Sequence, residues 1–80
     1  MRNTLGGRIR AARKHFGMTQ PEFANAVGVG AGTRVSEWEN DRTTPHHKYL
    51  EAMARVLSGQ GERIDMGWLI TGTGTMLRRS

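Results

Sequence analysis

The segment from Thr19 to Gly28 constrains the fold more than any other part of this sequence. Thr19 and Glu22 have the T-x-x-E spacing of a capping box, which predicts the start of a helix. Gly28 fits the left-handed backbone position that ends a helix, so the helix spans only about two and a half turns. An isolated helix shorter than ~12 residues is marginal in water. This helix must therefore share a core with other elements.

The other periodic segments are also helical, and none alternates with period two for long enough to predict a strand. The first helix should end at Gly17, a third should cover roughly residues 32–40, and Pro45 is expected at the first position of the fourth. We expect Ser58–Arg63 to be a polar loop and a last short helix to begin at Asp65. One apolar face per helix supplies the expected core, with Leu5, Ile9, Ala12 and Phe16 in the first helix, Phe23, Ala24 and Val27 in the second, Val35 and Trp38 in the third, Leu50, Met53, Ala54 and Leu57 in the fourth, and Ile64, Trp68 and Leu69 at the last.

The expected fold is therefore all-α, a compact five-helix domain. We expect residues 1–72 to form this one domain and residues 73–80 to be a flexible basic C-terminal tail.

Length and composition exclude several classes of protein. A chain of 80 residues has room for one core, which excludes large enzymes. It has no cysteine, so a disulfide framework, a thiolate zinc site and a cysteine nucleophile are excluded, and the chain suits a reducing cytoplasm. No apolar run approaches the ~18 residues that a membrane span requires, so no membrane partner is expected. Basic residues interrupt the N-terminus from Arg2 to Lys14, unlike a secretory signal.

The net charge of +5 is concentrated near the two ends of the sequence. Residues 1–20 hold five basic and no acidic groups, residues 21–70 hold five basic and seven acidic groups, and residues 71–80 add Arg78 and Arg79. A pI near 11.1 together with a basic N-terminal segment points to a polyanion as partner, most often nucleic acid. The alternative is a merely soluble surface.

Two short helices joined by a tight glycine-bearing turn make the helix-turn-helix pattern, and Gln20, Ala24, Gly28, Val35 and Trp38 occupy its positions here. Residues 5–72 resemble the lambda-repressor-like DNA-binding domains, also called the xenobiotic-response-element family of bacterial and phage regulators. The matching stretches, in chain order, are LGGRIRAARK, GMTQPEFANAVGV, SEWEN, PHHKYLEAMARVL and DMGWLITG. The resemblance implies a helix-turn-helix formed by the second and third helices, with the third lying in the major groove of double-stranded DNA.

The resemblance also implies which residues read the bases. The expected base-contacting residues are Gly32, Thr33, Arg34 and Glu37, with Ala31 at the edge of the set. Arg34 is the main candidate, because a guanidinium can hydrogen-bond guanine O6 and N7 together. A phosphate contact or a solvated side chain is the alternative for Arg34, and a solvent-facing side chain is the alternative for Glu37.

Phosphate contacts are expected at the start of the second helix, where backbone amides are exposed, and in the loop after the third helix. The residues concerned are Gln20, Asn40, Arg42, Thr43 and Thr44. A local capping interaction is the alternative for Gln20, and a plain surface charge is the alternative for Arg42.

By the same resemblance, Arg13 and Glu39 are expected to form a partly buried, structural ion pair that holds the third helix against the first. Two solvated side chains are the alternative.

Three features depart from the family pattern. One residue more than usual lies between Gly28 and Trp38, which leaves two registers open for the start of the third helix. The loop Ser58–Arg63 is longer than usual, and Gly67 replaces an acidic residue. The last two changes touch the end of the domain at which family members often dimerise.

No other pattern predicts chemistry. The histidines His15, His46 and His47 are not expected to bind a metal, because adjacent side chains on a helix diverge by ~100°. Gly72 and Gly74 make no phosphate-binding loop, since no strand precedes them. We expect no cofactor and no enzymatic activity.

The sequence therefore predicts a sequence-specific transcriptional regulator of the phage or prophage repressor kind, which binds an operator as a homodimer in the cytoplasm. Two alternatives stay open. One is an antitoxin-type regulator that neutralises a protein partner and represses its own operon. The other is a nonspecific nucleic-acid binder driven by the basic ends.

Overall fold

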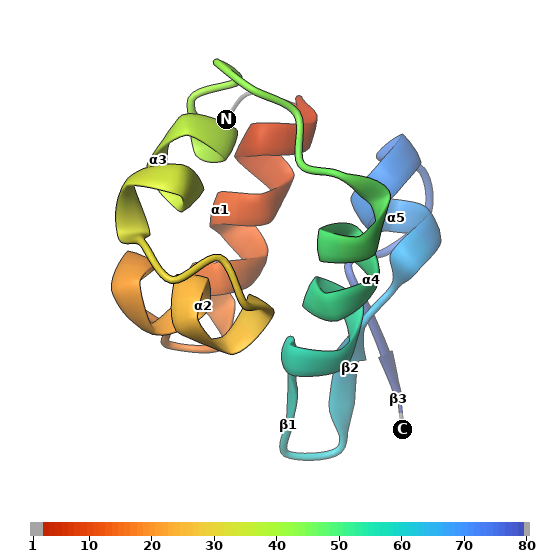
Figure 1. Ribbon diagram of the computed structural model, residues 1–80. Coiled ribbons are helices and arrows are strands. Elements are labelled where there is room, and N and C mark those ends of the chain that lie inside the picture. Colours follow the sequence, from red (N-terminus) through yellow and green to blue (C-terminus); the bar gives the residue numbers. More distant parts are fainter. Residues whose placement is uncertain (1–2, 80) are drawn as a thin grey trace.

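The computed structural model describes residues 3–79, which form five helices and a small three-stranded antiparallel sheet. The elements are α1 (Leu5–His15), α2 (Gln20–Val27), α3 (Gly32–Glu39), α4 (His47–Val56), β1 (Ser58–Gly59), β2 (Glu62–Ile64), α5 (Met66–Thr71) and β3 (Leu77–Arg79). Figure 1 shows α1 in the middle, α2 and α3 on one side of it, and α4 and α5 on the other. Within the described range, no helix is long and apolar enough to cross a membrane.

Local signals in the sequence explain how α1 and α2 begin and end. The Thr4 hydroxyl accepts a hydrogen bond from the Gly7 amide at the start of α1, and Gly17 follows its end with a φ of 72°. The capping box at the start of α2 is confirmed, since the Thr19 hydroxyl accepts from the Glu22 amide and the Glu22 carboxylate accepts from the Thr19 amide. At the other end of α2, Gly28 has a φ of 92°.

The core lies between the helices and largely follows the predicted apolar faces. Most of the predicted core residues are buried, while Leu5, Phe16, Ala54 and Trp68 are only partly buried against the core. Ala24 is fully buried in α2, where a small side chain allows α2 and α3 to pack closely. The buried set comprises Ile9, Ala12, Phe23, Ala24, Val27, Val35, Trp38, Leu50, Ala52, Met53, Leu57, Ile64 and Leu69.

The predicted start of the fourth helix is wrong by two residues. α4 begins at His47, and the ring nitrogen Nδ1 of His46 accepts a hydrogen bond from the Lys48 amide at 3.1 Å. Pro45 precedes this cap and is buried. Its fixed φ suits the first turn of a helix, but the His46 side chain satisfies an amide there, and Pro45 is used for packing instead.

The prediction of an all-α fold is also wrong where Ser58–Arg63 was expected to be a loop. β1 and β2 form a hairpin in which Gly59 pairs with Glu62. Its two central residues, Gln60 and Gly61, have φ values of 52° and 79°, as a two-residue turn with left-handed geometry requires. Strands of two and three residues are too short to produce a readable alternation, so periodicity alone did not reveal them.

The end of the chain differs from the predicted frayed tail as well. Leu77–Arg79 form β3, which pairs antiparallel with β2 so that Ile64 lies opposite Leu77. The Asp65 amide also donates a hydrogen bond of 2.8 Å to the carbonyl of Met76. The pairing joins segments that a helix separates in the chain, so no local pattern predicts it.

Candidate nucleic-acid interface

The turn between α2 and α3 is closed tightly at the end of α2. The Ala24 carbonyl accepts hydrogen bonds from the amides of Gly28, Val29 and Gly30 at 3.0, 3.0 and 3.4 Å. Gly30 has a φ of 75°, a backbone conformation that residues with a side chain rarely adopt. A glycine therefore suits this position of the turn, and α3 begins at Gly32.

The start of α3 packs directly on the start of α2. A Cβ atom added to Gly32 would lie 3.2 Å from the backbone nitrogen of Pro21, which is tighter than ordinary van der Waals contact. Of the expected base-contacting residues, Gly32 is thus half-buried against α2. The absence of a side chain at this position serves the packing of the two helices.

The other expected base-contacting residues lie on the exposed side of α3. Thr33, Arg34 and Glu37 are exposed, whereas Val35 and Trp38 face the core. Glu37 lies four positions after Thr33 and three after Arg34, so the three exposed residues share one side of the helix. This side is free to meet a partner over the first one and a half turns of α3.

No side chain caps the start of α3. Ala31 has the extended backbone of an N-cap residue, with φ −138° and ψ 127°, but it carries no hydrogen-bonding group. The first amides of a helix have no partner within the helix itself. The amides at the start of α3 are therefore left without a side-chain acceptor, next to the exposed Thr33 and Arg34.

Arg13 and Glu39 form a two-point ion pair beneath this surface. Arg13 Nε lies 2.6 Å from Glu39 Oε2, Arg13 Nη2 donates to Glu39 Oε1 at 3.1 Å, and the two side chains are only 9% and 3% exposed. Gln20 Nε2 donates to the same Oε1 atom at 3.1 Å, and Arg13 Nη1 donates to the Met18 carbonyl at 2.7 Å. The pair therefore connects α1, the start of α2 and the end of α3, and it holds the Gln20 side chain toward Glu39.

The remaining expected phosphate-contacting residues lie in the loop after α3. Asn40, Arg42, Thr43 and Thr44 are all exposed. The Asn40 side-chain amide also donates a hydrogen bond of 2.8 Å to the Ser36 carbonyl, so part of its bonding capacity is used to close the end of α3.

This loop is anchored to the start of α1 by Asp41, which the sequence did not single out. The Asp41 carboxylate accepts hydrogen bonds from the Thr4 hydroxyl at 2.7 Å and from the Gly6 amide at 3.0 Å. A side chain on Gly6 would collide with the Trp38 carbonyl, so a glycine is required for α1 to come this close to α3. The hydroxyl at Thr4 was a readable capping signal, but no local pattern links it to a residue 37 positions away.

Arg8 is a second anchoring residue that the sequence did not reveal, and it is buried. Its Nε donates to the Leu69 carbonyl at 2.9 Å and its Nη2 donates to the Ile70 carbonyl at 3.0 Å. A cation is favourable here, because the last carbonyls of α5 carry the negative end of the helix dipole. Arg8 thereby ties α1 to α5, on the side of α1 away from α3 (Figure 1).

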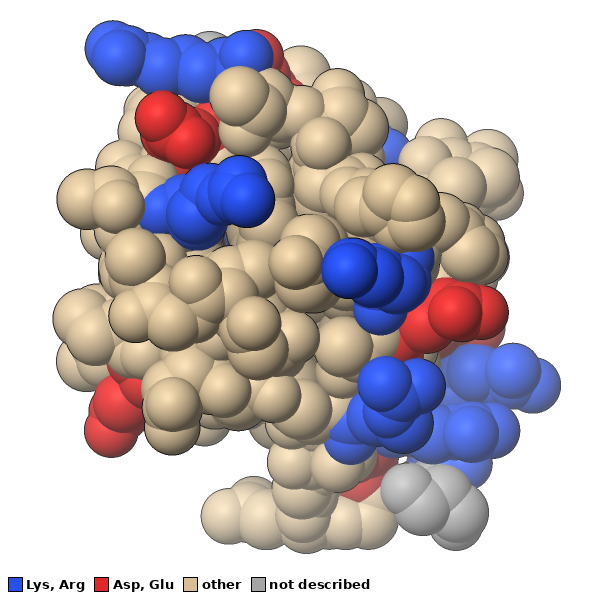
Figure 2. Space-filling view, viewed as in Figure 1, with Lys and Arg blue, Asp and Glu red and all other residues tan. Residues whose placement is uncertain are grey.

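Figure 2 shows how charge is distributed over one face of the molecule. Lys and Arg side chains lie over the loop after α3 at the top, over α3 itself, over α4, and in a dense group over the sheet at the lower right. Uncharged surface and several acidic side chains separate these basic groups. The basic side chains over α3 and over the loop after it are the ones that suit a polyanion at the proposed interface.

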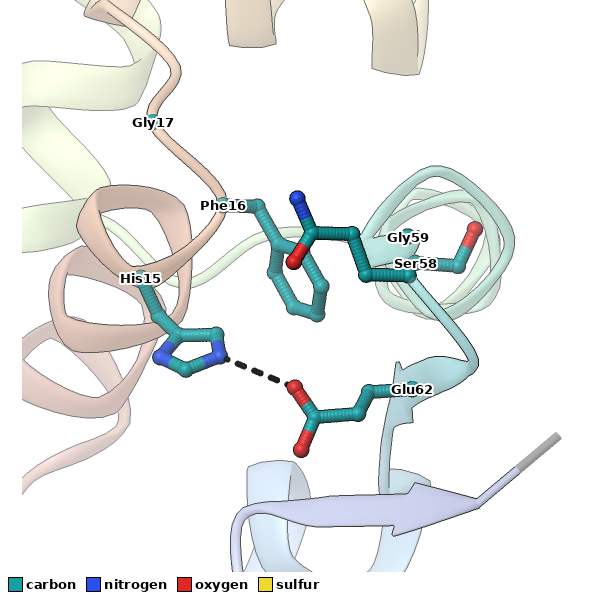
Figure 3. A pocket seen from close by; sticks show the side chains of 7 residues that line it. His15, Phe16, Gly17, Ser58, Gly59 and Glu62 are labelled. Atoms are coloured by element: carbon teal, nitrogen blue, oxygen red, sulfur yellow. Dashed lines mark ion pairs between the residues drawn. The ribbon is translucent and has the colours of Figure 1, made fainter.

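A small cavity of about 330 Å³ lies between the end of α1 and the β1–β2 hairpin (Figure 3). His15 and Glu62 face each other there, with His15 Nε2 at 3.5 Å from Glu62 Oε1, and both side chains are substantially exposed. Of the other histidines, His47 has its Nε2 atom 3.5 Å from Glu51 Oε2 on α4. Within residues 3–79, no group of three or more His, Cys, Asp or Glu residues is placed to hold a metal ion.

Comparison with known proteins agrees with this geometry. The family model described as "Helix-turn-helix domain" matches residues 4–65, which include α1 to α4 and the β1–β2 hairpin. No curated protein and no solved structure was found to match the chain. The match covers most of the chain and contains both helices of the exposed pair, α2 and α3, so the protein belongs to the helix-turn-helix family of the Cro and repressor type, a family of DNA-binding domains.

Proposed function

We propose that the protein is a sequence-specific transcriptional regulator that inserts the start of α3 into the major groove of an operator. The observation that carries this proposal is the exposed and uncapped start of α3, which the buried Arg13–Glu39 pair holds rigidly against the rest of the domain. A rigid exposed helix end of this kind can meet base edges without a large ordering cost.

Arg34 is the proposed base-reading residue. It is exposed, and among the described residues it forms no ion pair that would hold it away from DNA. Its guanidinium can donate two hydrogen bonds to one guanine, which is worth about 1–3 kcal/mol of discrimination. Thr33 and Glu37 share its side of α3, and Gly32 and Ala31 have no long side chain to keep the helix end out of the groove.

The proposed phosphate contacts flank this helix end. Arg42, Thr43 and Thr44 are exposed in the loop that Asp41 anchors to α1, so their position relative to α3 is fixed. The Gln20 side chain uses one hydrogen bond inside the protein and retains a further amide hydrogen for a phosphate oxygen. The Asn40 side-chain amide donates to the carbonyl and the hydroxyl of Ser36, so its phosphate contact would use the exposed side of the same amide group. Such contacts position the protein on the duplex and carry little sequence information.

The finer proposal is a homodimeric repressor of the phage or prophage kind. One domain of this size covers few base pairs, and two-fold pairing would double the contacts across half-sites about one helical turn apart. The amides at the start of α3 and the basic side chains around it support the DNA-binding part of this proposal. The dimer is supported only by the need for selectivity.

The experiment that tests the proposal is selection of duplexes from a random pool with the purified chain, followed by sequencing of the enriched duplexes. We expect a defined motif arranged as an inverted repeat. An enriched motif without a repeat would argue against the dimer, and enrichment of no motif would argue against sequence-specific regulation.

Two variants then separate base reading from phosphate contact. Arg34→Ala should reduce the difference in affinity between the selected motif and a scrambled duplex, whereas Arg42→Ala should weaken binding to both alike. Arg10→Ala, at an exposed position of α1, is the matched control for the loss of one charge and should leave the preference for the motif unchanged. Equal effects of the Arg34 and Arg42 variants on the two duplexes would contradict the assigned roles.

A further inference from the structure

Three arginines come together on the outer side of the sheet and the end of α4. Arg63 lies opposite Ser58 in β1 and opposite Arg78 in β3, so these three side chains point to one face of the sheet. Arg55 on α4 lines the same groove as Ser58 and Arg63. We call Arg55, Arg63 and Arg78 the arginine cluster.

The positive charge of this cluster is poorly compensated within the protein. Like charges directly opposite each other in a sheet are destabilising, and Arg63 and Arg78 have this arrangement. The Asp65 carboxylate lies 3.4 Å from Arg78 Nε, but among residues 3–79 neither Arg55 nor Arg63 forms an ion pair. The nearby carboxylates of Glu51 and Glu62 lie against His47 and His15 instead.

The cluster borders an open groove of about 540 Å³, lined by Ala54, Arg55, Ser58 and Arg63. The small side chains of Ala54 and Ser58 leave space between the two guanidinium groups. Arginine presents its donors in a planar fork that matches two oxygens of a phosphate. An exposed pair of unpaired arginines on either side of a groove is therefore suited to a phosphodiester backbone.

The position of the cluster indicates which phosphates it meets. Figure 2 shows basic side chains over the sheet at the lower right, partly farther back and separated by a broad uncharged area from those over α3 and the loop after α3. We propose that the arginine cluster binds phosphates of the same duplex that α3 contacts, outside the base pairs that α3 reads. The proposal rests on the function proposed above for the location of those base pairs.

The test compares two double variants that lose the same charge. Arg55→Gln with Arg63→Gln removes the two unpaired arginines of the cluster, and Arg10→Gln with Lys14→Gln removes two exposed cations from α1. Thermal unfolding of both variants checks that the fold is retained. DNA affinity is measured over a range of salt concentrations for two duplexes. The trimmed duplex contains only the selected motif, and the extended duplex adds about ten base pairs on each side of it.

On the extended duplex, we expect the cluster variant to lower the salt dependence of log affinity by about two units, one for each lost phosphate contact. Between 50 and 200 mM salt, the wild type should then lose roughly tenfold more affinity than the variant. On the trimmed duplex, the cluster variant should have the same affinity as the wild type. The α1 control should lose the same affinity on the trimmed and the extended duplex, because its loss reports only the reduced net charge. Preference for the motif over a scrambled duplex should not change.

Three outcomes would overturn the proposal. Equal losses for the cluster variant and the α1 control would mean that only overall charge matters. Equal losses on trimmed and extended duplexes would mean that the cluster does not meet flanking phosphates. Recruitment of a second labelled duplex by a wild-type complex, lost in the cluster variant, would assign the cluster to a different duplex. If selection enriches no motif, the function proposed above fails, but random duplexes of two lengths still test the cluster.

Discussion

The start of α2 and the start of α3 lie against each other, but side chains cap the backbone amides only at the start of α2. At α2, the Thr19 hydroxyl and the Glu22 carboxylate satisfy backbone amides reciprocally. At α3, the Ala31 side chain provides no hydrogen-bonding group, and the Arg34 amide donates to the Ala31 backbone carbonyl at 3.1 Å, while Gly32 packs on Pro21. The two helices have the same length, so their length does not explain the difference.

The contrast shows which helix end stabilises the fold and which is available to a ligand. A helix start with its own side-chain cap is stable in the absence of any partner. A helix start without a cap leaves donors that a phosphate or a base edge can satisfy, at a small cost in stability. In this protein, the uncapped end belongs to the helix that we propose to enter the major groove.

The largest expected effect is that of breaking the buried ion pair that joins α1 to the end of α3. Glu39→Ala should lower the free energy of unfolding by about 3–5 kcal/mol, because Arg13 would remain buried without a carboxylate. Urea denaturation measures this loss. Glu37→Ala, on the same helix but exposed, should change stability by less than about 0.5 kcal/mol. Similar losses from both variants would mean that burial of the pair contributes little.

The next effect distinguishes the two helix starts directly. Thr19→Ala removes the cap of α2 and should lower the free energy of unfolding by about 1 kcal/mol. Thr33→Ala is the matched change at the start of α3, where no side chain caps the helix, and it should leave stability within about 0.5 kcal/mol of the wild type. A larger loss of unfolding free energy for Thr33→Ala than for Thr19→Ala would mean that the start of α3, and not that of α2, depends on a side-chain cap.

Adding a cap to α3 should abolish the contrast. Ala31→Ser places a hydroxyl at a residue that already has an extended backbone, and it should raise stability by about 0.5–1 kcal/mol. The same variant should weaken DNA binding, because the new hydroxyl competes with DNA for the amides at the start of α3, of which the Arg34 amide donates only to the Ala31 carbonyl. Ala26→Ser, at an exposed position inside α2, is the control and should do neither. A stabilised protein with unchanged DNA affinity would show that these amides do not meet DNA.

The smallest effect concerns the pH dependence of the capped end. The hydrogen bond from the Thr19 amide, and secondly the Thr19 side chain, lower the pKa of Glu22 below its ordinary value of 4.5. Because the folded state favours the ionised carboxylate, this contribution to stability is complete above about pH 4.5 and is lost as the pH falls through the lower folded-state pKa. Between pH 6 and pH 3, the melting temperature of the wild type should therefore fall slightly more than that of Glu22→Gln. Parallel curves would mean that the carboxylate at α2 is not used in the cap.

Much of the helical part of the fold was predictable, because its signals are local. The capping box at Thr19 and the glycine stop at Gly28 are each readable within a few residues. The hairpin of β1 and β2 was missed because its strands are very short, although the dipeptide Gln60–Gly61 offered a weak turn signal. β3 offered no local signal, because its partner β2 lies on the other side of α5.

The candidate site likewise has features that the sequence predicted and features that it did not. The exposure of Thr33, Arg34 and Glu37 follows from the spacing of Val35 and Trp38 on the opposite side of a regular helix. The contact between Gly32 and Pro21 does not follow from spacing, since it depends on how closely two helices approach.

The sequence by itself determined where α2 begins and ends, which face of each helix is apolar, and that α2 and α3 form a helix-turn-helix. These properties depend on side chains that are neighbours in the chain. Only the tertiary structure decided that Asp41 holds the loop after α3 on the start of α1, and that Arg8 closes the end of α5 from a position 61 residues away. Such contacts join groups that come together only after the helices have packed, and their geometry is a property of the assembled core.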